Sequence, residues 1–279
     1  MNFSLNLLNF REISLTTSFA YFFVIHGSRN PETLIAASKL QQLLTWKIKS
    51  KIRTTESDVL GNNLSSANLR NIAVLDSFKT PLVEIAALEL GALPLNQSLI
   101  KFAHKAYLQG LNRVKVVPLF LAPGVHVKED IPEEISLAVK EVNNIVTIEL
   151  STFLGNYSEI TQLIVDKFGN LSAQTRILVS HGSRLPGVAD YYQSLASRVN
   201  AVNAYWSTDP SLDRQVELQV NAGKKRIGIL PYFLFPGKIT NAIADQVKQL
   251  QTRYPKVELI LGQPLGSTEA LAELIAREI

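Results

Sequence analysis

The sequence predicts an α/β protein of two similar lobes, each a parallel β-sheet flanked by helices. Three observations support this fold class. Short apolar runs alternate with amphipathic segments along the 279 residues, the pattern occurs twice, and several motifs of the first half recur in the second half. A chain of this length accommodates one large domain or two of ordinary size, and the alternation of strands with helices is typical of parallel sheets.

Eight segments are expected to form the strands. Several of them are almost continuously apolar, as expected for strands of a parallel sheet that helices cover on both faces. The predicted strands are 19–25, 83–90, 113–120 and 144–150 in the first half, and 176–180, 202–207, 226–233 and 257–262 in the second half.

The segments between the strands have the periodicity of helices. Apolar residues stand at positions 160, 163, 164 and 168 after one strand, and the same spacing recurs at 271, 274, 275 and 279. This spacing places the side chains on one face of a helix. His104 lies in another amphipathic segment, so we expect it on the surface of a helix.

Two repeated motifs divide the chain into its lobes. VVPLFLAPG (116–124) recurs 113 residues later as ILPYFLFPG (229–237), whereas VIHGSRNPE (24–32) recurs 155 residues later as VSHGSRLPG (179–187). The difference of 42 residues predicts an insertion in the first half, located in the polar segment 45–74, in which a short helix is possible. We therefore expect an N-terminal extension (1–18), a first lobe (19–172) and a second lobe (173–279).

Composition excludes several classes of function. The chain has no cysteine, which rules out disulfides, thiolate catalysis and zinc–cysteine sites. Its 28 Lys and Arg against 24 Asp and Glu are spread too evenly to indicate a nucleic-acid partner. No run approaches the roughly 20 apolar residues of a membrane span, and the N-terminus lacks the features of a secretory signal. We expect a cytoplasmic protein with neither a membrane nor a nucleic-acid partner.

Candidate site residues lie where strands of the first lobe end. His26 follows the first strand directly, Glu89 lies near the end of the second, and His126 is in the loop after the third. The carboxyl ends of parallel strands meet at one edge of the sheet. Two imidazoles and a carboxylate that converge there would suit a borderline divalent cation such as Fe²⁺ or Co²⁺.

The second lobe repeats only part of this set. Ile239 corresponds to His126, and Trp206 or a neighbour corresponds to Glu89, so only His181 is retained. This lobe should therefore be unable to hold a metal in the same way. Its motif still supplies an imidazole, the hydroxyl of Ser183 and the guanidinium of Arg184, which suit the binding of carboxylates.

Sequence motifs of other enzyme classes are absent or incomplete. The sequence contains no G-x-S-x-G nucleophile elbow, no P-loop and no G-x-G-x-x-G loop. PGKIT (236–240) lacks the upstream glycine of a P-loop. A histidine-dependent phosphoryl-transfer site would need an arginine directly before the histidine, but Ile25 and Ser180 occupy those positions.

The motifs together resemble the class II chelatases of the CbiX/SirB type, which insert a metal into sirohydrochlorin. The resemblance rests on VIHGSRNPE, ALEL and VPLFLAPGVHVKEDIP in the first half and on LVSHGSR, PSL and LPYFLFPG in the second. It implies two flavodoxin-like lobes with the tetrapyrrole bound in the cleft between them. It also implies that His26 and His126 handle the metal, with Glu89 nearby.

The resemblance further implies a mechanism and a set of substrate contacts. His26 and His126 would present the metal and remove pyrrole protons, with Glu89 as an auxiliary ligand or proton acceptor. Sirohydrochlorin is rich in carboxylates, so the expected anchors are Ser28, Arg29, His181, Ser183 and Arg184. No permanently bound cofactor is implied, and a duplicated chain could form the cleft as a monomer. Iron and cobalt both stay open, and a non-catalytic tetrapyrrole or metal carrier is the alternative function.

Overall fold

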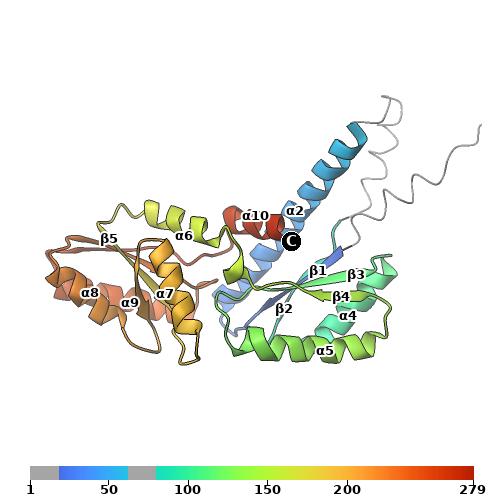
Figure 1. Ribbon diagram of the computed structural model, residues 1–279, viewed down its shortest axis with the longest axis horizontal. Helices are drawn as coiled ribbons and strands as arrows, with labels where there is room; N and C mark the ends of the chain where they lie inside the picture. Colours follow the sequence, from blue (N-terminus) through green and yellow to red (C-terminus); the bar gives the residue numbers. More distant parts are fainter. Residues whose placement is uncertain (1–18, 62–79) are drawn as a thin grey trace, which may run out of the picture.

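The computed structural model of the chain describes residues 19–61 and 80–279. It describes the side chains of all these residues except 53–61. It contains two four-stranded sheets in which every pairing is parallel, with strand orders β2-β1-β3-β4 and β6-β5-β7-β8. The two orders are equivalent, because in each lobe the first strand lies between the second and the third. The predicted fold class of two similar α/β lobes is confirmed (Figure 1).

The first lobe holds the strands β1 to β4 and the second lobe β5 to β8, each strand within a predicted segment or one residue beyond it. The strands are β1 (Phe19–Ile25), β2 (Val83–Ala87), β3 (Arg113–Pro118), β4 (Thr147–Leu150), β5 (Thr175–Ser180), β6 (Val202–Tyr205), β7 (Arg226–Pro231) and β8 (Glu258–Leu261). The strand expected at 144–150 begins only at Thr147, since Asn143 and Asn144 adopt positive φ angles of 49° and 63° after the preceding helix.

Helices follow the strands in both lobes. They are α2 (Pro31–Gly61), α4 (Leu95–Leu108), α5 (Ile131–Val142), α6 (Ile160–Gly169), α7 (Val188–Arg198), α8 (Leu212–Asn221), α9 (Lys238–Arg253) and α10 (Glu269–Glu278), with the short helical turns η2 (His126–Asp130) and η3 (Leu154–Asn156). Within the described residues, no helix has both the length and the apolar character that crossing a membrane requires.

The segment 45–74, expected as an insertion, belongs in part to a long helix. Residues 45–61 continue α2 without a break, so the short helix expected there is the second half of a helix that starts at Pro31. Leu40, Leu44 and Ile48 are buried at intervals of four residues and extend the core face into this segment. Residues 62–74 lie outside the described residues.

Burial on both faces of the sheet explains why β1 is apolar throughout. In β1, Phe22 and Val24 pack into a core under α4 and α5, whereas Phe23 and Ile25 point to the opposite face. Side chains of successive strand residues point to opposite faces of a sheet. Both faces of the sheet are therefore buried, as the continuous apolar runs predicted.

The helix that ends each half of the chain packs against the other half. α6 follows β4 of the first lobe but contacts β7 of the second, and α10 follows β8 of the second lobe but packs along α2 of the first (Figure 1). The Nζ atom of Lys167 in α6 donates to the carbonyl of Pro264, and the Nζ atom of Lys51 in α2 donates to the carbonyl of Ala276, both at 2.8 Å. The two lobes thus exchange a helix.

Candidate metal site and the second-lobe pocket

Three potential metal ligands meet at the carboxyl edge of the first sheet. His26 follows β1, Glu89 lies two residues after β2, and His126 begins η2 after β3. One ligand atom of each side chain lies within 4.8 Å of one atom of each of the others. Among the described residues, this is the only group of three or more His, Asp or Glu side chains with such a geometry. The structure therefore brings together the three residues that the sequence singled out.

The backbone between the first two ligands depends on Gly27. The amide of Glu89 donates to the carbonyl of His26 at 2.9 Å, which brings the ends of β1 and β2 together. Gly27 has a φ angle of +105°, and a Cβ atom there would lie 1.9 Å from the carbonyl oxygen of Glu89. Only glycine fits both the conformation and the approach.

The two imidazoles lie edge to face beside an aromatic ring. The ring centroids of His26 and His126 are 4.9 Å apart with an interplanar angle of 82°. Phe120 lies 6.4 Å from the first ring and 5.9 Å from the second, centroid to centroid. Phe120 thus provides an apolar neighbour to both histidines, of which His26 is exposed and His126 half-buried.

Asp130 orients His126. Its Oδ2 atom lies 2.6 Å from Nδ1 of His126, one helical turn earlier. A proton on Nδ1 that points to this carboxylate leaves the lone pair of Nε2 free for a metal, and carboxylates behind metal-ligating histidines are common in metal sites. The sequence predicted a loop at His126, but the structure has a helical turn there. The sequence signal for the partner of His126 was therefore the acidic residue four positions later, Asp130.

Backbone hydrogen bonds identify the second-lobe counterparts. The amide of Ser207 donates to the carbonyl of His181 at 2.9 Å, as the amide of Glu89 does to His26. Ser207 therefore stands where the first lobe has Glu89, next to the predicted Trp206. Ile239, the counterpart of His126, lies at the beginning of α9. The second lobe thus keeps one of the three potential ligands.

The other predicted site residues lie in the two His-Gly-Ser-Arg loops. The hydroxyls of Ser28 and Ser183 accept hydrogen bonds from the amides of Asn30 and Leu185, at 3.0 and 3.1 Å, and so shape the loops. Arg29 and Arg184 are exposed. His104 lies on the exposed side of α4, with Nδ1 2.8 Å from the carbonyl of Ile100, away from the histidine pair.

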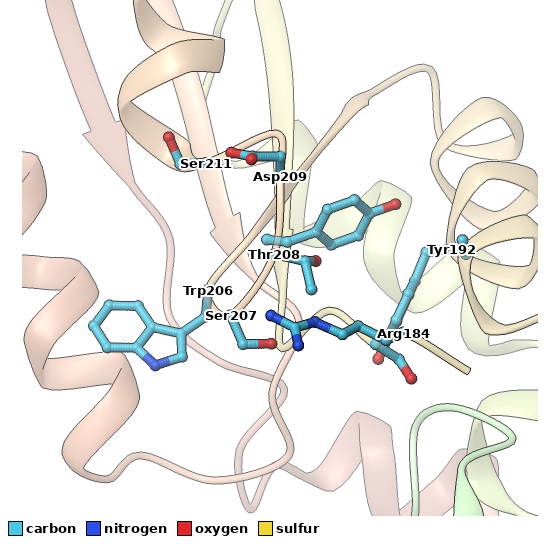
Figure 2. Close-up of a pocket in the computed structure, with 10 residues that line it drawn as sticks. Arg184, Tyr192, Trp206, Ser207, Thr208, Asp209 and Ser211 are labelled. Carbon is cyan, nitrogen blue, oxygen red and sulfur yellow. The ribbon is translucent and has the colours of Figure 1, made fainter. Parts of the chain in front are cut away.

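An open cavity of about 610 Å³ lies at the carboxyl edge of the second sheet (Figure 2). It lies between the second His-Gly-Ser-Arg loop and the loop after β6. The residues that line it are Ser183, Arg184, Ala189, Tyr192, Tyr205, Trp206, Ser207, Thr208, Asp209 and Ser211. Two of the expected substrate anchors, Ser183 and Arg184, are therefore part of this cavity, hereafter the second-lobe pocket.

Comparison with known proteins agrees with this arrangement. The CbiX family model matches the chain twice, over residues 61–171 and 175–279. The chain belongs to the CbiX family. The first match lies within the first half of the chain and begins after β1, so it does not include His26, whereas the second match spans β5 to α10.

Several relatives of the chain carry the name of sirohydrochlorin chelatases. The chain is 26% identical over 212 residues to the sirohydrochlorin ferrochelatase of Priestia megaterium, covering 71% of this chain and 77% of that protein. It is also 26% identical over 174 residues to the sirohydrochlorin cobaltochelatase of the same organism, covering 57% and 56%. Among solved structures, SirB from Bacillus subtilis with Fe³⁺ has the same fold, with a TM-score of 0.68 and 20% identity over 94% of each chain.

Proposed function

We propose that this CbiX-family protein is a sirohydrochlorin chelatase that inserts Fe²⁺ or Co²⁺ into the macrocycle. The observation that carries the proposal is the group formed by His26, Glu89 and His126 at one sheet edge. Nitrogen and oxygen donors of this kind suit borderline divalent metals. The metal is a substrate of this reaction, since it leaves the protein within the product.

The chemistry requires a metal carrier and proton acceptors. Insertion replaces two pyrrole protons by one divalent cation, so two protons must leave the macrocycle. Imidazoles can ligate a metal or accept a proton near neutral pH. We assign the presentation of the metal and the removal of protons to His26 and His126, with the carboxylate of Glu89 as auxiliary ligand or proton acceptor.

The tetrapyrrole would bind where the two lobes meet. Segments beyond the carboxyl ends of both sheets touch there. The hydroxyl of Thr33, in the first turn of α2, donates to the carbonyl of Pro236 at 2.8 Å, and that of Tyr232 donates to the carbonyl of Leu121 at 3.2 Å. The exposed Arg29 and Arg184 would bind peripheral carboxylates there, as guanidinium groups do well. We assign supporting contacts to Ser28, His181 and Ser183.

The test is metal insertion followed by absorption spectroscopy. The protein is incubated with sirohydrochlorin and Co²⁺ or Fe²⁺, and the spectral change of the macrocycle is compared with the spontaneous rate. A rate no higher than the spontaneous one would refute the chelatase proposal. Stable tetrapyrrole or metal binding without acceleration would instead support a carrier.

Two histidine variants test the one-lobe metal site. We predict that His126→Ala lowers the rate by at least about a hundredfold, whereas His181→Ala has a much smaller effect because its lobe lacks the other two ligands. Equal losses in the two variants would contradict a metal site in the first lobe alone. Co²⁺ titration of both variants separates lost metal binding from lost catalysis.

A further inference from the structure

The second-lobe pocket contains an arginine without a partner. Among the described residues, the guanidinium of Arg184 takes part in no ion pair and no hydrogen bond. In Figure 2 it points toward Ser207 and Thr208 on the loop after β6. An unpaired planar guanidinium beside hydroxyl groups is suited to a carboxylate, which it can bind through two parallel hydrogen bonds.

Neutral aromatic side chains accompany this cation. Trp206 is 42% exposed at the pocket, and the rings of Tyr192 and Tyr205 lie beside each other with centroids 5.8 Å apart. Burial raises the pKa of both phenols, so they stay uncharged at neutral pH and do not repel an anion. The exposed indole offers a flat surface for a conjugated ring.

The charges of the pocket are separated. Its one carboxylate, Asp209, lies beside Ser211 in Figure 2, whereas the Arg184 guanidinium lies at the other end, beside Ser207. Ser207 also occupies the place that Glu89 has in the first lobe, so a hydroxyl stands there in the position of a carboxylate. The sheet edge of the second lobe thus lacks the metal-binding group of the first lobe and presents Arg184 beside hydroxyl groups at that place.

We infer that the second-lobe pocket binds a peripheral carboxylate of the tetrapyrrole through Arg184 and Thr208, while Trp206 packs against the ring that bears it. The inference rests on the proposed function and adds a specificity element to it. It makes the second lobe select macrocycles with many carboxylate arms, while the first lobe handles the metal. Arg184 and Thr208 then determine which macrocycle binds, Trp206 adds affinity for the ring, and none of the three touches the metal.

The experiment compares two porphyrins as probes. Uroporphyrin carries an acetate and a propionate on every pyrrole, whereas mesoporphyrin carries only two propionates. Dissociation constants of both are measured for the wild-type protein, Arg184→Met, Arg184→Lys and Trp206→Ala. The matched controls are Arg214→Met on the exposed surface of α8 and Trp46→Ala, the other exposed tryptophan.

We expect Arg184→Met to weaken uroporphyrin binding by at least about tenfold and to affect mesoporphyrin less, so that the preference for uroporphyrin shrinks. Arg184→Lys should recover part of the loss, since the charge remains but the planar fork does not. Trp206→Ala should weaken both probes, and the controls should match wild type. Co²⁺ binding should be unchanged in all variants.

Three outcomes separate this inference from the proposed function. The pocket assignment is overturned if Arg184→Met binds uroporphyrin as tightly as wild type does, or no more weakly than Arg214→Met. The chelatase proposal stays intact in that case. The pocket assignment is also overturned if Arg184→Met weakens the binding of uroporphyrin and of mesoporphyrin by the same factor. If the wild-type protein binds no tetrapyrrole, the proposed function itself fails.

Discussion

At the scale of single residues, His126 gains its orientation from a side chain one helical turn away. Asp130 contacts Nδ1 of His126 at 2.6 Å, and the two side chains are 42% and 32% exposed. Without this contact the imidazole could rotate and present either nitrogen. The carboxylate thus holds Nδ1 and leaves Nε2 as the nitrogen available to a metal.

We predict that Asp130→Asn weakens Co²⁺ binding by about 10- to 100-fold, the usual effect of losing a partner behind a metal ligand. The asparagine keeps the size of the side chain but not its charge. A Co²⁺ titration followed by visible absorption measures the effect. Glu129→Gln removes the adjacent exposed carboxylate as a control. Equal affinities of the two variants would exclude an orienting role for Asp130.

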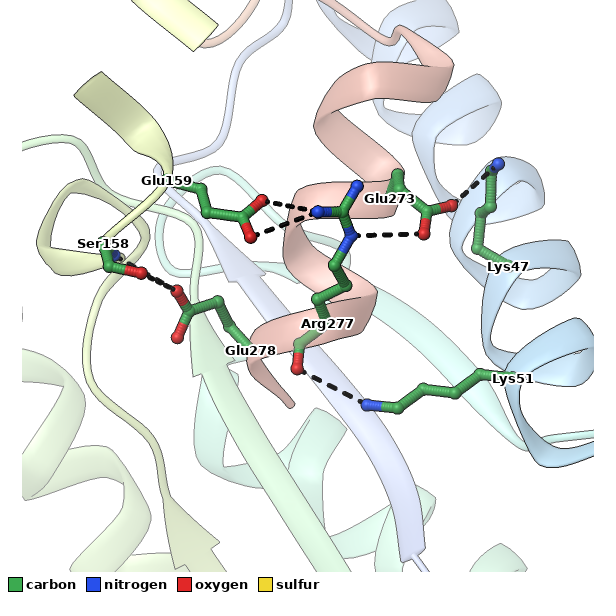
Figure 3. A network of polar contacts seen from close by, with 7 residues as sticks. All are labelled: Lys47, Lys51, Ser158, Glu159, Glu273, Arg277 and Glu278. Atoms are coloured by element: carbon green, nitrogen blue, oxygen red, sulfur yellow. Dashed lines mark hydrogen bonds and ion pairs between the residues drawn. The ribbon is translucent and has the colours of Figure 1, made fainter. Parts of the chain in front are cut away.

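At the scale of elements, α10 is tied to the first lobe by a polar network (Figure 3). Glu273 of α10 pairs with Lys47 of α2 at 2.8 Å, and Arg277 of α10 contacts both carboxylate oxygens of Glu159 at 3.1 Å. Ser158 donates its hydroxyl to Glu278 at 2.7 Å. These contacts join the end of the second half to two segments of the first and complete the exchange of helices.

The network predicts a pH dependence of stability. The hydrogen bond from Lys47 lowers the pKa of the Glu273 carboxyl below its ordinary 4.5. A carboxylate with a lowered pKa in the folded state stabilises the protein above its unfolded pKa, and this contribution is lost as the pH falls through the lowered value. We predict that Glu273→Gln lowers the Tm by roughly 1–2 °C at pH 7.

The difference from wild type should shrink as the pH falls below 4.5 and disappear below the lowered pKa of Glu273, where this carboxylate is protonated in the folded protein as well. Thermal unfolding at a series of pH values measures it. Glu141→Gln, on the exposed side of α5, serves as the control. A Tm difference that persists unchanged below the lowered pKa would show that the charge of Glu273 does not stabilise α10.

At the scale of the whole molecule, one hydrophobic core extends through both lobes. It includes Phe23 of β1 and Leu178 of β5, together with residues of α2, α6, α7 and α10. Separate cores lie on the outer faces of the two sheets. Because the exchanged helices contribute to the shared core, neither sheet can keep its inner face covered if the other half unfolds.

We therefore predict that the two lobes unfold together. Each lobe has one tryptophan, Trp46 in α2 and Trp206 after β6, so Trp46→Phe and Trp206→Phe each leave a probe in one lobe. The two variants should give the same midpoint in urea. Ile275→Ala, which truncates a fully buried side chain of α10, should cost about 2–5 kcal/mol and move both midpoints equally. Different midpoints for the two probes would show that the lobes unfold independently.

The sequence by itself determined the strands, the duplication and the convergence of His26, Glu89 and His126. Strand propensity and apolar runs are local properties, and the topology of a parallel sheet brings strand ends to one edge whatever the details of packing. The assignment of Ser207 as the counterpart of Glu89 needed the backbone pairing, because the sequences after β2 and β6 share too little to align.

Only the tertiary structure decided which sheet each helix covers. The spacing of Ile160, Leu163, Ile164 and Phe168 shows that one face of α6 is buried, but the same spacing fits either sheet. The second-lobe pocket and the exchange of α6 and α10 likewise depend on contacts between segments far apart in the chain. The periodicity of apolar residues determines which face of a helix is buried. The sheet that covers this face is determined by the packing of the whole chain.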